Sequence, residues 1–224
     1  NGRVIFQNPD DLQMFLAQNL VRRDIAVMIK GCGVDMATFS PVDPPDEPPD
    51  ESPDESLVVM FPARIRGDKG VHEFIHGRRD PANPTDVAER TIHAWESEGL
   101  VEWWGFRTDM PAVLPQAHII CMPSYREGLP RGLIEAAACG LPIVTADVPG
   151  CREVVRHDET GYLVPVRDGP ATAEAIGKLL HDPALRRAMG QAARQLALDE
   201  FTVEAFVADT LATYDAVLPR ADAG

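Results

Sequence analysis

The sequence is short of cysteine, of basic side chains relative to acidic ones, and of long apolar runs. No stretch approaches the roughly 20 apolar residues that a helix needs to cross a bilayer, and the opening residues Asn1-Gly2-Arg3 do not begin a signal peptide. The sequence therefore predicts a chain without a membrane span of its own. Because position 1 is not Met, we expect the chain to be a fragment of a longer protein.

Cysteine and charge exclude further classes of protein. The four cysteines (positions 32, 121, 139 and 151) lack the close pairing of a zinc knuckle or a redox dithiol, so a reducing, cytoplasmic setting is predicted. With 21 basic and 35 acidic residues, the formal charge of −14 opposes long-range approach to nucleic acid or to an anionic membrane. We expect no nucleic-acid partner, and any phosphate site must be local.

The first third of the sequence combines a small α/β piece with a polar stretch. Residues Arg3 to Phe6 and Ile25 to Ile29 predict two short strands around an amphipathic helix that starts near Asp10. Pro41 to Ser56 consists almost entirely of Pro, Asp, Glu and Ser, which cannot bury apolar surface. We therefore expect residues 41–56 to form an acidic, Pro-rich mobile loop.

From Leu57 onward, short apolar runs alternate with helical segments, which is typical of a parallel sheet covered on both faces. The predicted strands are Leu57 to Phe61, Val101 to Trp104, His118 to Met122, Pro142 to Thr145 and Tyr162 to Val164. Helices are predicted to begin near Asp86, Met110, Pro130 and Ala171, and two more should span 183–198 and 203–218. This pattern favours an α/β fold with a Rossmann-like, doubly wound sheet over residues 57–200.

One gap interrupts the pattern. After the turn that ends at Gly70, only Val71 to Ile75 is left of the first crossover helix before a loop-like run over 78–85. A crossover with its helix and next strand needs on the order of 20 to 30 residues. Either a helix and a strand are deleted here, or the sequence omits a segment; we favour the second, because losing an inner strand would leave unpaired backbone groups.

The most informative motif lies at 123–140, after a buried strand and at the start of a helix. Pro130 suits the first helical position, and Gly140 supplies the C-terminal stop. The backbone N–H groups of Gly128, Leu129 and Arg131 should then point out of the carboxyl edge of the sheet. Such a helix start favours a phosphate, through its dipole and its unpaired donors.

Two carboxylates flank this helix start. Glu127 lies in the loop before it, and Glu135 lies about a turn and a half inside it. Carboxylates accept hydrogen bonds from paired sugar hydroxyls, so the two could contact different parts of one extended ligand. The alternative is structural: Glu127 would cap the helix, and Glu135 would be an ordinary solvated residue.

The frame Pro-Ser-x-x-Glu-Gly-x-Pro-x-x-x-x-Glu-Ala, from Pro123 to Ala136, resembles the signature of retaining GT-B glycosyltransferases of the family-4-like group. The resemblance implies that Glu127 contacts the donor sugar and that Glu135 holds the ribose hydroxyls. It also implies that the backbone of Gly128, Leu129 and Pro130 contacts sugar and phosphate.

A second matching motif is Pro62-Ala-Arg-Ile-Arg-Gly-Asp-Lys-Gly70, where the family places an Arg and a Lys on the donor diphosphate. By this resemblance Arg64 and Lys69 take those roles. Two cations can stabilise the charge that builds on a departing diphosphate without a metal. Arg66 and Arg131, by contrast, are interpreted as surface charge.

Weaker similarities extend the resemblance along nearly the whole chain. The segment from Gly31 to Asp35, with Gly33 at its centre, resembles the cleft between the lobes, and Gly105-Phe106-Arg107 resembles the turn beside the nucleobase. The run Val4 to Asp11 resembles the tail of the first lobe in bacterial polysaccharide and lipid-linked-sugar transferases. We therefore expect residues 1–40 to end an N-terminal lobe and residues 201–224 to form a helix that packs back toward it.

The resemblance implies a retaining transferase that moves a sugar from a UDP- or GDP-sugar to a hydroxyl of a glycan or lipid-linked acceptor. No cofactor and no metal are expected. The full-length enzyme would associate peripherally with the inner face of the plasma membrane, and the fragment alone would be inactive. The alternative is a non-catalytic nucleotide-binding module or a truncated pseudoenzyme.

A third class of function remains to be weighed. His72-Glu73-Phe-Ile-His76 satisfies the pattern of a zinc hydrolase, with Glu96 available by spacing as a further ligand, but His76 falls at the suspected omission and a solvated helix face is the favoured interpretation. The sequence contains neither a dinucleotide Gly fingerprint nor a Walker loop, which argues against hydride and phosphoryl transfer. The three tryptophans, at positions 95, 103 and 104, lie among Glu residues and indicate packing, not a nucleic-acid platform.

Overall fold

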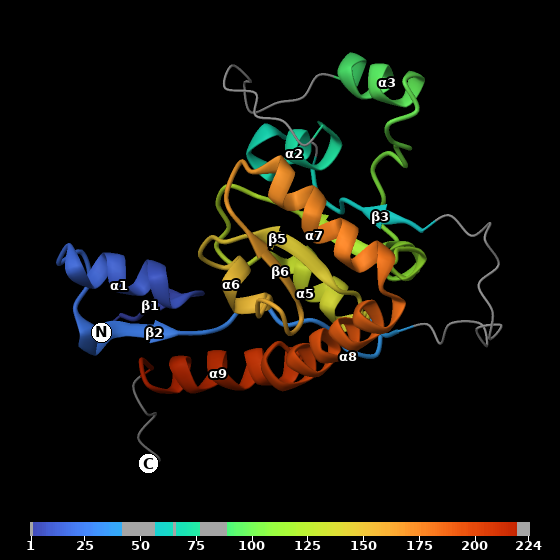
Figure 1. Ribbon diagram of the computed structural model, residues 1–224. Helices are drawn as coiled ribbons and strands as arrows, with labels where there is room; N and C mark the ends of the chain where they lie inside the picture. The colour runs from blue at the N-terminus through green and yellow to red at the C-terminus, as the bar shows by residue number, and fades with distance from the viewer. Residues whose placement is uncertain (1, 42–56, 65, 77–88, 219–224) are drawn as a thin grey trace, which may run out of the picture.

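The computed structural model describes residues 2–41, 57–64, 66–76 and 89–218. These residues form two separate parallel sheets, a two-stranded one near the start of the chain and a four-stranded one in the remainder (Figure 1). No helix among the described residues is long and apolar enough to cross a bilayer. The four cysteines are free thiols, and three of them are buried.

The two-stranded sheet belongs to the small α/β piece predicted from the sequence. Strand β1 (Val4–Phe6) pairs in parallel with β2 (Ala26–Met28), and helix α1 (Pro9–Ala17) connects them. Asn8 caps the helix, because its side chain accepts a hydrogen bond from the backbone N–H of Asp11. The predicted strands and helix are confirmed, with shorter strand bounds.

The four-stranded sheet is parallel throughout and runs in the order β3-β4-β5-β6. Its strands are β3 (Val59–Met60), β4 (Ile119–Met122), β5 (Ile143–Ala146) and β6 (Gly161–Val164). Every residue of β4 and β5 is buried, as expected for a parallel sheet with both faces covered. The predicted α/β class is confirmed, although β3 is shorter than the predicted Leu57 to Phe61.

Helices cover both faces of this sheet (Figure 1). Helices α2 and α7 pack on one face, and α5, α6 and α8 pack on the other, where the larger core cluster lies. The helices are α2 (Val71–His76), α3 (Glu89–Ser97), α4 (Met110–Val113), α5 (Arg131–Ala138), α6 (Cys151–Val154), α7 (Gly169–His181), α8 (Pro183–Glu200) and α9 (Val203–Asp215). Short 3-10 turns lie at 23–25, 67–69 and 114–116.

The strand predicted at Val101 to Trp104 is wrong, because this segment is irregular in the structure. In a doubly wound sheet the third strand lies two positions from the first, so it needs the intervening strand as its neighbour. The described residues contain no such strand, and β3 pairs with β4 alone. The backbone N–H of Trp103 donates instead to the Glu96 carboxylate at 3.0 Å, which satisfies it outside any sheet.

Two further predictions fall wholly or partly outside the described residues. The acidic loop, predicted over 41–56, is described only at Pro41, and the loop-like run over 78–85 is not described. The helix predicted near Asp86 is described from Glu89 onward as α3. The suspected omission after Ile75 therefore stays a prediction.

The segment from Ile29 to Pro41 joins the two sheets along helices α5, α8 and α9. Val34 donates its N–H to the Phe201 carbonyl at 2.9 Å. The guanidinium of Arg194, on α8, donates hydrogen bonds to three backbone carbonyls: those of Met36 at 3.0 Å, Phe39 at 2.7 Å and Ala138 at 2.5 Å. One side chain thus fastens the connecting segment to the C-terminal end of α5.

Candidate functional site

The candidate site is built on the loop between β4 and α5, at the carboxyl edge of the four-stranded sheet. Five buried apolar residues of α5 anchor the helix in the core: Leu133, Ile134, Ala136, Ala137 and Ala138. Because β4 is also buried, the loop between them has a fixed start and a fixed end. Pro130 occupies the N-cap and the helix begins at Arg131, so the prediction of Pro130 at the first helical position is wrong by one residue.

The structure brings Lys69 and Glu127 into direct contact. The Lys69 Nζ lies 2.5 Å from the Glu127 Oε1, and the two side chains are only 19% and 11% exposed. Desolvation offsets most of the attraction in an ion pair this deeply placed, so the pair adds little to stability. Because the pair lies at the carboxyl edge of a parallel sheet, where ligands bind in such folds, its position fits the binding of a charged ligand better than a role in stability.

A second contact aligns the two loops that carry this pair. The Tyr125 N–H donates to the Asp68 carbonyl at 2.9 Å. Gly70 follows the 3-10 turn with a φ of +80°, and a Cβ there would lie 2.1 Å from the carbonyl oxygen of Pro123. Only glycine allows so close an approach of the two backbones, so Gly70 is needed for Lys69 to reach Glu127.

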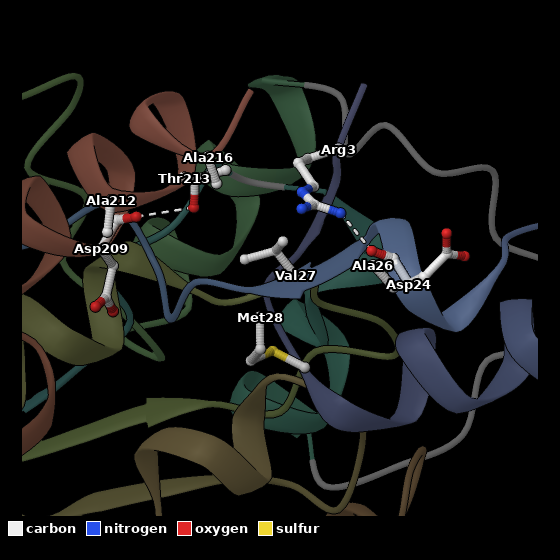
Figure 2. A pocket seen from close by; sticks show the side chains of 9 residues that line it. All are labelled: Arg3, Asp24, Ala26, Val27, Met28, Asp209, Ala212, Thr213 and Ala216. Atoms are coloured by element: carbon white, nitrogen blue, oxygen red, sulfur yellow. Dashed lines mark hydrogen bonds between the residues drawn. The ribbon is translucent and has the colours of Figure 1, made fainter. Parts of the chain in front are cut away.

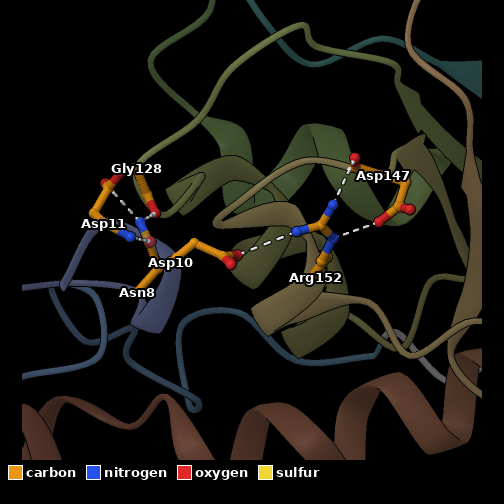
Figure 3. Close-up of polar contacts among 6 residues, drawn as sticks. All are labelled: Asn8, Asp10, Asp11, Gly128, Asp147 and Arg152. Carbon is orange, nitrogen blue, oxygen red and sulfur yellow. Dashed lines mark hydrogen bonds and ion pairs between the residues drawn. The ribbon is translucent and has the colours of Figure 1, made fainter. Parts of the chain in front are cut away.

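Gly128 and Leu129 lie against two other parts of the chain. The Gly128 carbonyl accepts a hydrogen bond of 2.8 Å from the Asn8 side chain (Figure 3). Gly150 also packs closely on this carbonyl, since a Cβ at Gly150 would lie 2.3 Å from its oxygen. The side chain of Leu129 touches Gly31, where a Cβ would lie 2.7 Å from the Leu129 Cδ2. The first α/β piece and the connecting segment thus both meet the site loop.

Glu135 lies on α5, one turn from the helix start. Its Oε1 accepts a hydrogen bond of 2.8 Å from the Arg131 Nε, and its side chain is 13% exposed, whereas that of Arg131 is 61% exposed. The ordinary reading of Glu135 as a fully solvated residue therefore does not fit. The prediction of Arg131 as surface charge agrees with its exposure.

Other predicted site residues are not joined to this group by any hydrogen bond or ion pair among the described residues. Arg64 is exposed, and Arg66 pairs with Asp68. Gly105 and Phe106 lie in the irregular segment after Trp104, with Phe106 89% exposed.

Arg107 lies in the same segment and forms two hydrogen bonds with Asp109, at 2.8 and 2.6 Å. These bonds lower the pKa of Asp109 to about 2. Gly33 packs on the start of α9, where a Cβ would lie 2.6 Å from the Cα of Val203. Neither residue touches the pair of Lys69 and Glu127.

The zinc-like motif has a different structural use. Glu73 is buried and accepts hydrogen bonds from the Tyr125 hydroxyl at 2.8 and 3.0 Å, while the ring of His72 packs edge-on against Trp95. The side chain of His76 lies outside the described residues. Among the described residues, no group of three His, Cys, Asp or Glu side chains is placed to hold a metal.

Tyr125 was missed by the sequence argument, although it stands inside the motif. The guanidinium of Arg167 lies 4.6 Å from the centre of the Tyr125 ring. The backbone of Arg167 is left-handed, with a φ of +61°. Burial and the hydrogen bond to Glu73 raise the pKa of Tyr125 to about 12. A tyrosine between two charged side chains gives no signal in a linear sequence, because Glu73 is 52 residues away.

Replacing Tyr125 by phenylalanine should lower the free energy of unfolding at pH 8 by about 1–2 kcal/mol, since the Glu73 carboxylate loses a donor. Between pH 10 and 12 the unfolded chain loses the Tyr125 proton while the folded chain keeps it, so the wild-type stability falls as pH rises. The gap between the two proteins should therefore narrow by pH 11. Urea unfolding at both pH values measures it, and an equal gap at both would contradict the raised pKa.

A hollow of about 440 Å³ lies elsewhere, between the small sheet and α9. Figure 2 shows its lining side chains, among them Arg3 hydrogen-bonded to the Asp24 carbonyl, and Val27 and Met28 from β2. None of the predicted site residues lines it. The candidate site is therefore the loop edge of the larger sheet, not this hollow.

Comparison with known proteins connects this geometry to a family. The profile of the family described as "Glycosyl transferases group 1" matches residues 84–196, which include the whole site loop and α5. An N,N'-diacetylbacillosaminyl-diphospho-undecaprenol alpha-1,3-N-acetylgalactosaminyltransferase of Campylobacter jejuni is 29% identical over 210 residues, covering 88% of this chain and 56% of the relative. A D-inositol 3-phosphate glycosyltransferase of Salinispora tropica is 39% identical over 106 residues, covering 47% of this chain and 22% of the relative.

Solved structures agree on the fold. A sucrose-phosphate synthase of Thermosynechococcus elongatus superposes with a TM-score of 0.79 at 25% identity, covering 96% of this chain and 58% of that one. The Anabaena protein HepE, solved in complex with UDP and glucose, gives a TM-score of 0.78 at 21% identity, covering 96% of this chain and 63% of that one. These neighbours have the GT-B fold. The chain spans little more than half the length of the Campylobacter relative and of the synthase.

Proposed function

This chain belongs to the Glycosyl transferases group 1 family, and we propose that it forms the nucleotide-sugar-binding lobe of a retaining glycosyltransferase. The observation that carries the proposal is the contact of Lys69 with Glu127 at 2.5 Å, beside the helix that bears Glu135. In this proposal Lys69 meets the phosphate, Glu127 the sugar and Glu135 the ribose of one extended donor.

In this proposal Lys69 and Arg64 bind the diphosphate of the donor. Lys69 exchanges part of its contact with Glu127 for a phosphate oxygen, and the exposed side chain of Arg64 is free to swing onto the ligand. Both cations stabilise the charge that develops when the sugar C1–O bond breaks. Since the two cations supply this charge, the reaction is proposed to need no metal and no cofactor.

The other residues bind and orient the donor. Glu127 orients the sugar, the backbone of Gly128, Leu129 and Pro130 contacts sugar and phosphate, and Glu135 accepts hydrogen bonds from the ribose hydroxyls. The acceptor hydroxyl attacks C1 from the face that the diphosphate leaves, and its proton passes to the departing phosphate oxygen. The anomeric configuration is therefore kept.

Two further segments are proposed to complete the donor pocket. Gly33 lies in the connecting segment that touches α9, and Gly105-Phe106-Arg107 would lie beside the base. We also propose the division of the chain into residues 1–40 from an acceptor lobe, an acidic loop over 41–56, a donor lobe over 57–200, and a returning helix over 201–224. The separate two-stranded and four-stranded sheets support this division.

The donor is proposed to be a UDP- or GDP-sugar, and the acceptor a glycan or lipid-linked sugar. The name of the Campylobacter relative includes a diphospho-undecaprenol acceptor, and the Anabaena neighbour was solved with UDP. An acceptor of this kind would place the full-length enzyme in the cytoplasm at the inner face of the plasma membrane, bound peripherally.

Isothermal titration of the chain with UDP and with GDP tests the proposal. We expect one of them to bind, Glu135→Ala to weaken it about tenfold, and Arg64→Ala with Lys69→Ala to weaken it about a hundredfold, as expected for lost contacts to charged groups. Arg22→Ala, whose side chain is 77% exposed and belongs to the small α/β piece, serves as the control. Equal affinity in all variants would refute the assignment.

The alternative is a non-catalytic nucleotide-binding module or a truncated pseudoenzyme. It predicts nucleotide binding with the same sensitivity to Glu135→Ala but no transfer of sugar. Incubation of the full-length protein with radiolabelled UDP-sugars and a polyprenyl-linked glycan separates the two, since only the enzyme labels the acceptor.

A further inference from the structure

In the described part of the chain, Asn8 is the one residue before α1 whose side chain forms a hydrogen bond with the site loop. It is fully buried, with 0% of its surface exposed. Its Oδ1 accepts from the Asp11 N–H at 2.8 Å, and its Nδ2 donates to the Asp11 Oδ2 at 2.9 Å and to the Gly128 carbonyl at 2.8 Å (Figure 3). Both amide hydrogens and the oxygen are used, so the group has a single orientation.

Gly150 also packs closely against the Gly128 carbonyl. A Cβ at Gly150 would lie 2.3 Å from this oxygen, so the Gly150 backbone packs directly on it. Gly128 itself has no side chain to restrict its peptide, and glycine changes its backbone angles at little cost. The orientation of the peptide between Gly128 and Leu129 therefore depends on the groups that contact the Gly128 carbonyl.

A trans peptide is planar, with its C=O and N–H pointing in opposite directions. All peptide bonds described in the structure are trans. Because Asn8 holds the Gly128 carbonyl toward α1, the N–H of Leu129 must point away from α1. We infer that Asn8 is a positioning residue, which fixes the direction of the Leu129 N–H as a donor to a phosphate oxygen. The identity of that acceptor rests on the proposed function.

A second link holds α1 in place for this task. Arg152 of α6 donates to Asp147 at 2.5 Å and to Asp10 at 3.2 Å, and so joins the first turn of α1 to the turn that contains Gly150 (Figure 3). Because the Arg152 side chain is 43% exposed, its ion pair with Asp10 contributes little to the free energy of folding. The pair still joins the first turn of α1 to α6. The helix cap, the Gly150 turn and the site loop thus form one packed group.

Asn8→Asp separates this role from helix capping. Aspartate caps a helix as well as asparagine does, yet it replaces the amide donor with a second acceptor that faces both the Gly128 carbonyl and the Asp11 carboxylate. Asn8→Ser also keeps a cap but is too short to reach Gly128, and it serves where the aspartate variant fails to fold. Asn19→Asp introduces the same charge at an exposed position just beyond the C-terminal end of α1 and is the control.

Nuclear magnetic resonance can report a change in the orientation of the peptide between Gly128 and Leu129 without any ligand. Carbon-13 at glycine carbonyls and nitrogen-15 at leucine select the Gly–Leu peptides, which are 99–100, 128–129, 132–133 and 140–141. We expect Asn8→Asp and Asn8→Ser to shift the 128–129 signal and leave the other three in place, with no shift in Asn19→Asp. An unmoved 128–129 signal in both Asn8 variants would overturn the inference.

Titration then tests the consequence for phosphate. If Asn8 positions a phosphate donor, Asn8→Asp should weaken UDP binding about tenfold, the effect of one lost hydrogen bond to a charged group, and leave uridine binding unchanged. Unchanged UDP affinity in this variant, with Glu135→Ala still weakened, would overturn the role of Asn8 and leave the proposed function intact. If the wild-type chain binds neither UDP nor GDP, the proposed function fails, and the resonance experiment alone decides whether Asn8 sets the peptide.

Discussion

Replacing Gly70 by alanine should lower the free energy of unfolding by about 3 kcal/mol or more, at the upper end for single substitutions. Two costs add. The left-handed backbone at a φ of +80° disfavours any residue with a Cβ, and that Cβ would stand 2.1 Å from the Pro123 carbonyl oxygen. The loop that holds Lys69 must then move away from Pro123, so we also expect weaker nucleotide binding. Urea unfolding and titration with UDP measure the two effects.

Gly99→Ala is the matched control for this substitution. Gly99 has a similar φ of +69°, but a Cβ there meets nothing within 4 Å. It should therefore show only the conformational cost, about 1–2 kcal/mol. The difference between the losses of unfolding free energy in the two variants measures the cost of the close contact between the Lys69 loop and the Glu127 loop. Equal losses would mean that the backbone around Pro123 moves away from the added Cβ at no cost.

Replacing Arg194 by methionine should cost about 3 kcal/mol, because three carbonyl groups lose a charged donor while the apolar stem is largely preserved. These carbonyls belong to Met36, Phe39 and Ala138. Two lie in the segment that connects the sheets, and the third ends the helix that bears Glu135. The connecting segment should therefore loosen before the sheet unfolds, and hydrogen exchange should rise first over residues 31–41.

Gln195→Ala on the neighbouring exposed position controls for the helix itself, since among the described residues the Gln195 side chain hydrogen-bonds to Asp199 on the same helix and to no other residue. It should change stability by less than about 0.5 kcal/mol. Arg194→Lys keeps the charge but cannot spread donors over three carbonyls, so it should recover only part of the loss. Full recovery by lysine would show that charge alone, and not the planar fork, fastens the segment.

Much of the site loop could be predicted because it depends on local rules. A buried strand, a loop and a helix stopped by glycine follow from the residues between Ile119 and Gly140. Contacts between distant segments could not be predicted in this way. Nothing in the sequence links Asn8, which caps α1 in the structure, to Gly128, 120 positions away.

The wrong strand at Val101 to Trp104 shows a second limit. Its apolar residues satisfy the pattern of a strand, but a strand exists only when a neighbour completes its ladder. Among the described residues no such neighbour stands beyond β3, and the segment packs on Val71, Ile92 and Trp95 instead. The apolar pattern thus predicted that the segment packs against the protein, which it does with partly buried side chains, but it predicted the hydrogen bonds of the segment incorrectly.

That packing has a practical outcome for spectroscopy. Two of the three tryptophans belong to this small apolar cluster around Val71, Ile92 and Trp95: Trp95 is one of its buried members and Trp103 packs against it, whereas the main core cluster contains no tryptophan among the described residues. Intrinsic ultraviolet emission will therefore follow the melting of α3 and its surroundings, whereas far-ultraviolet circular dichroism will follow the helices around the sheet. Two non-coincident transitions from these probes would mark the cluster as a separately cooperative unit.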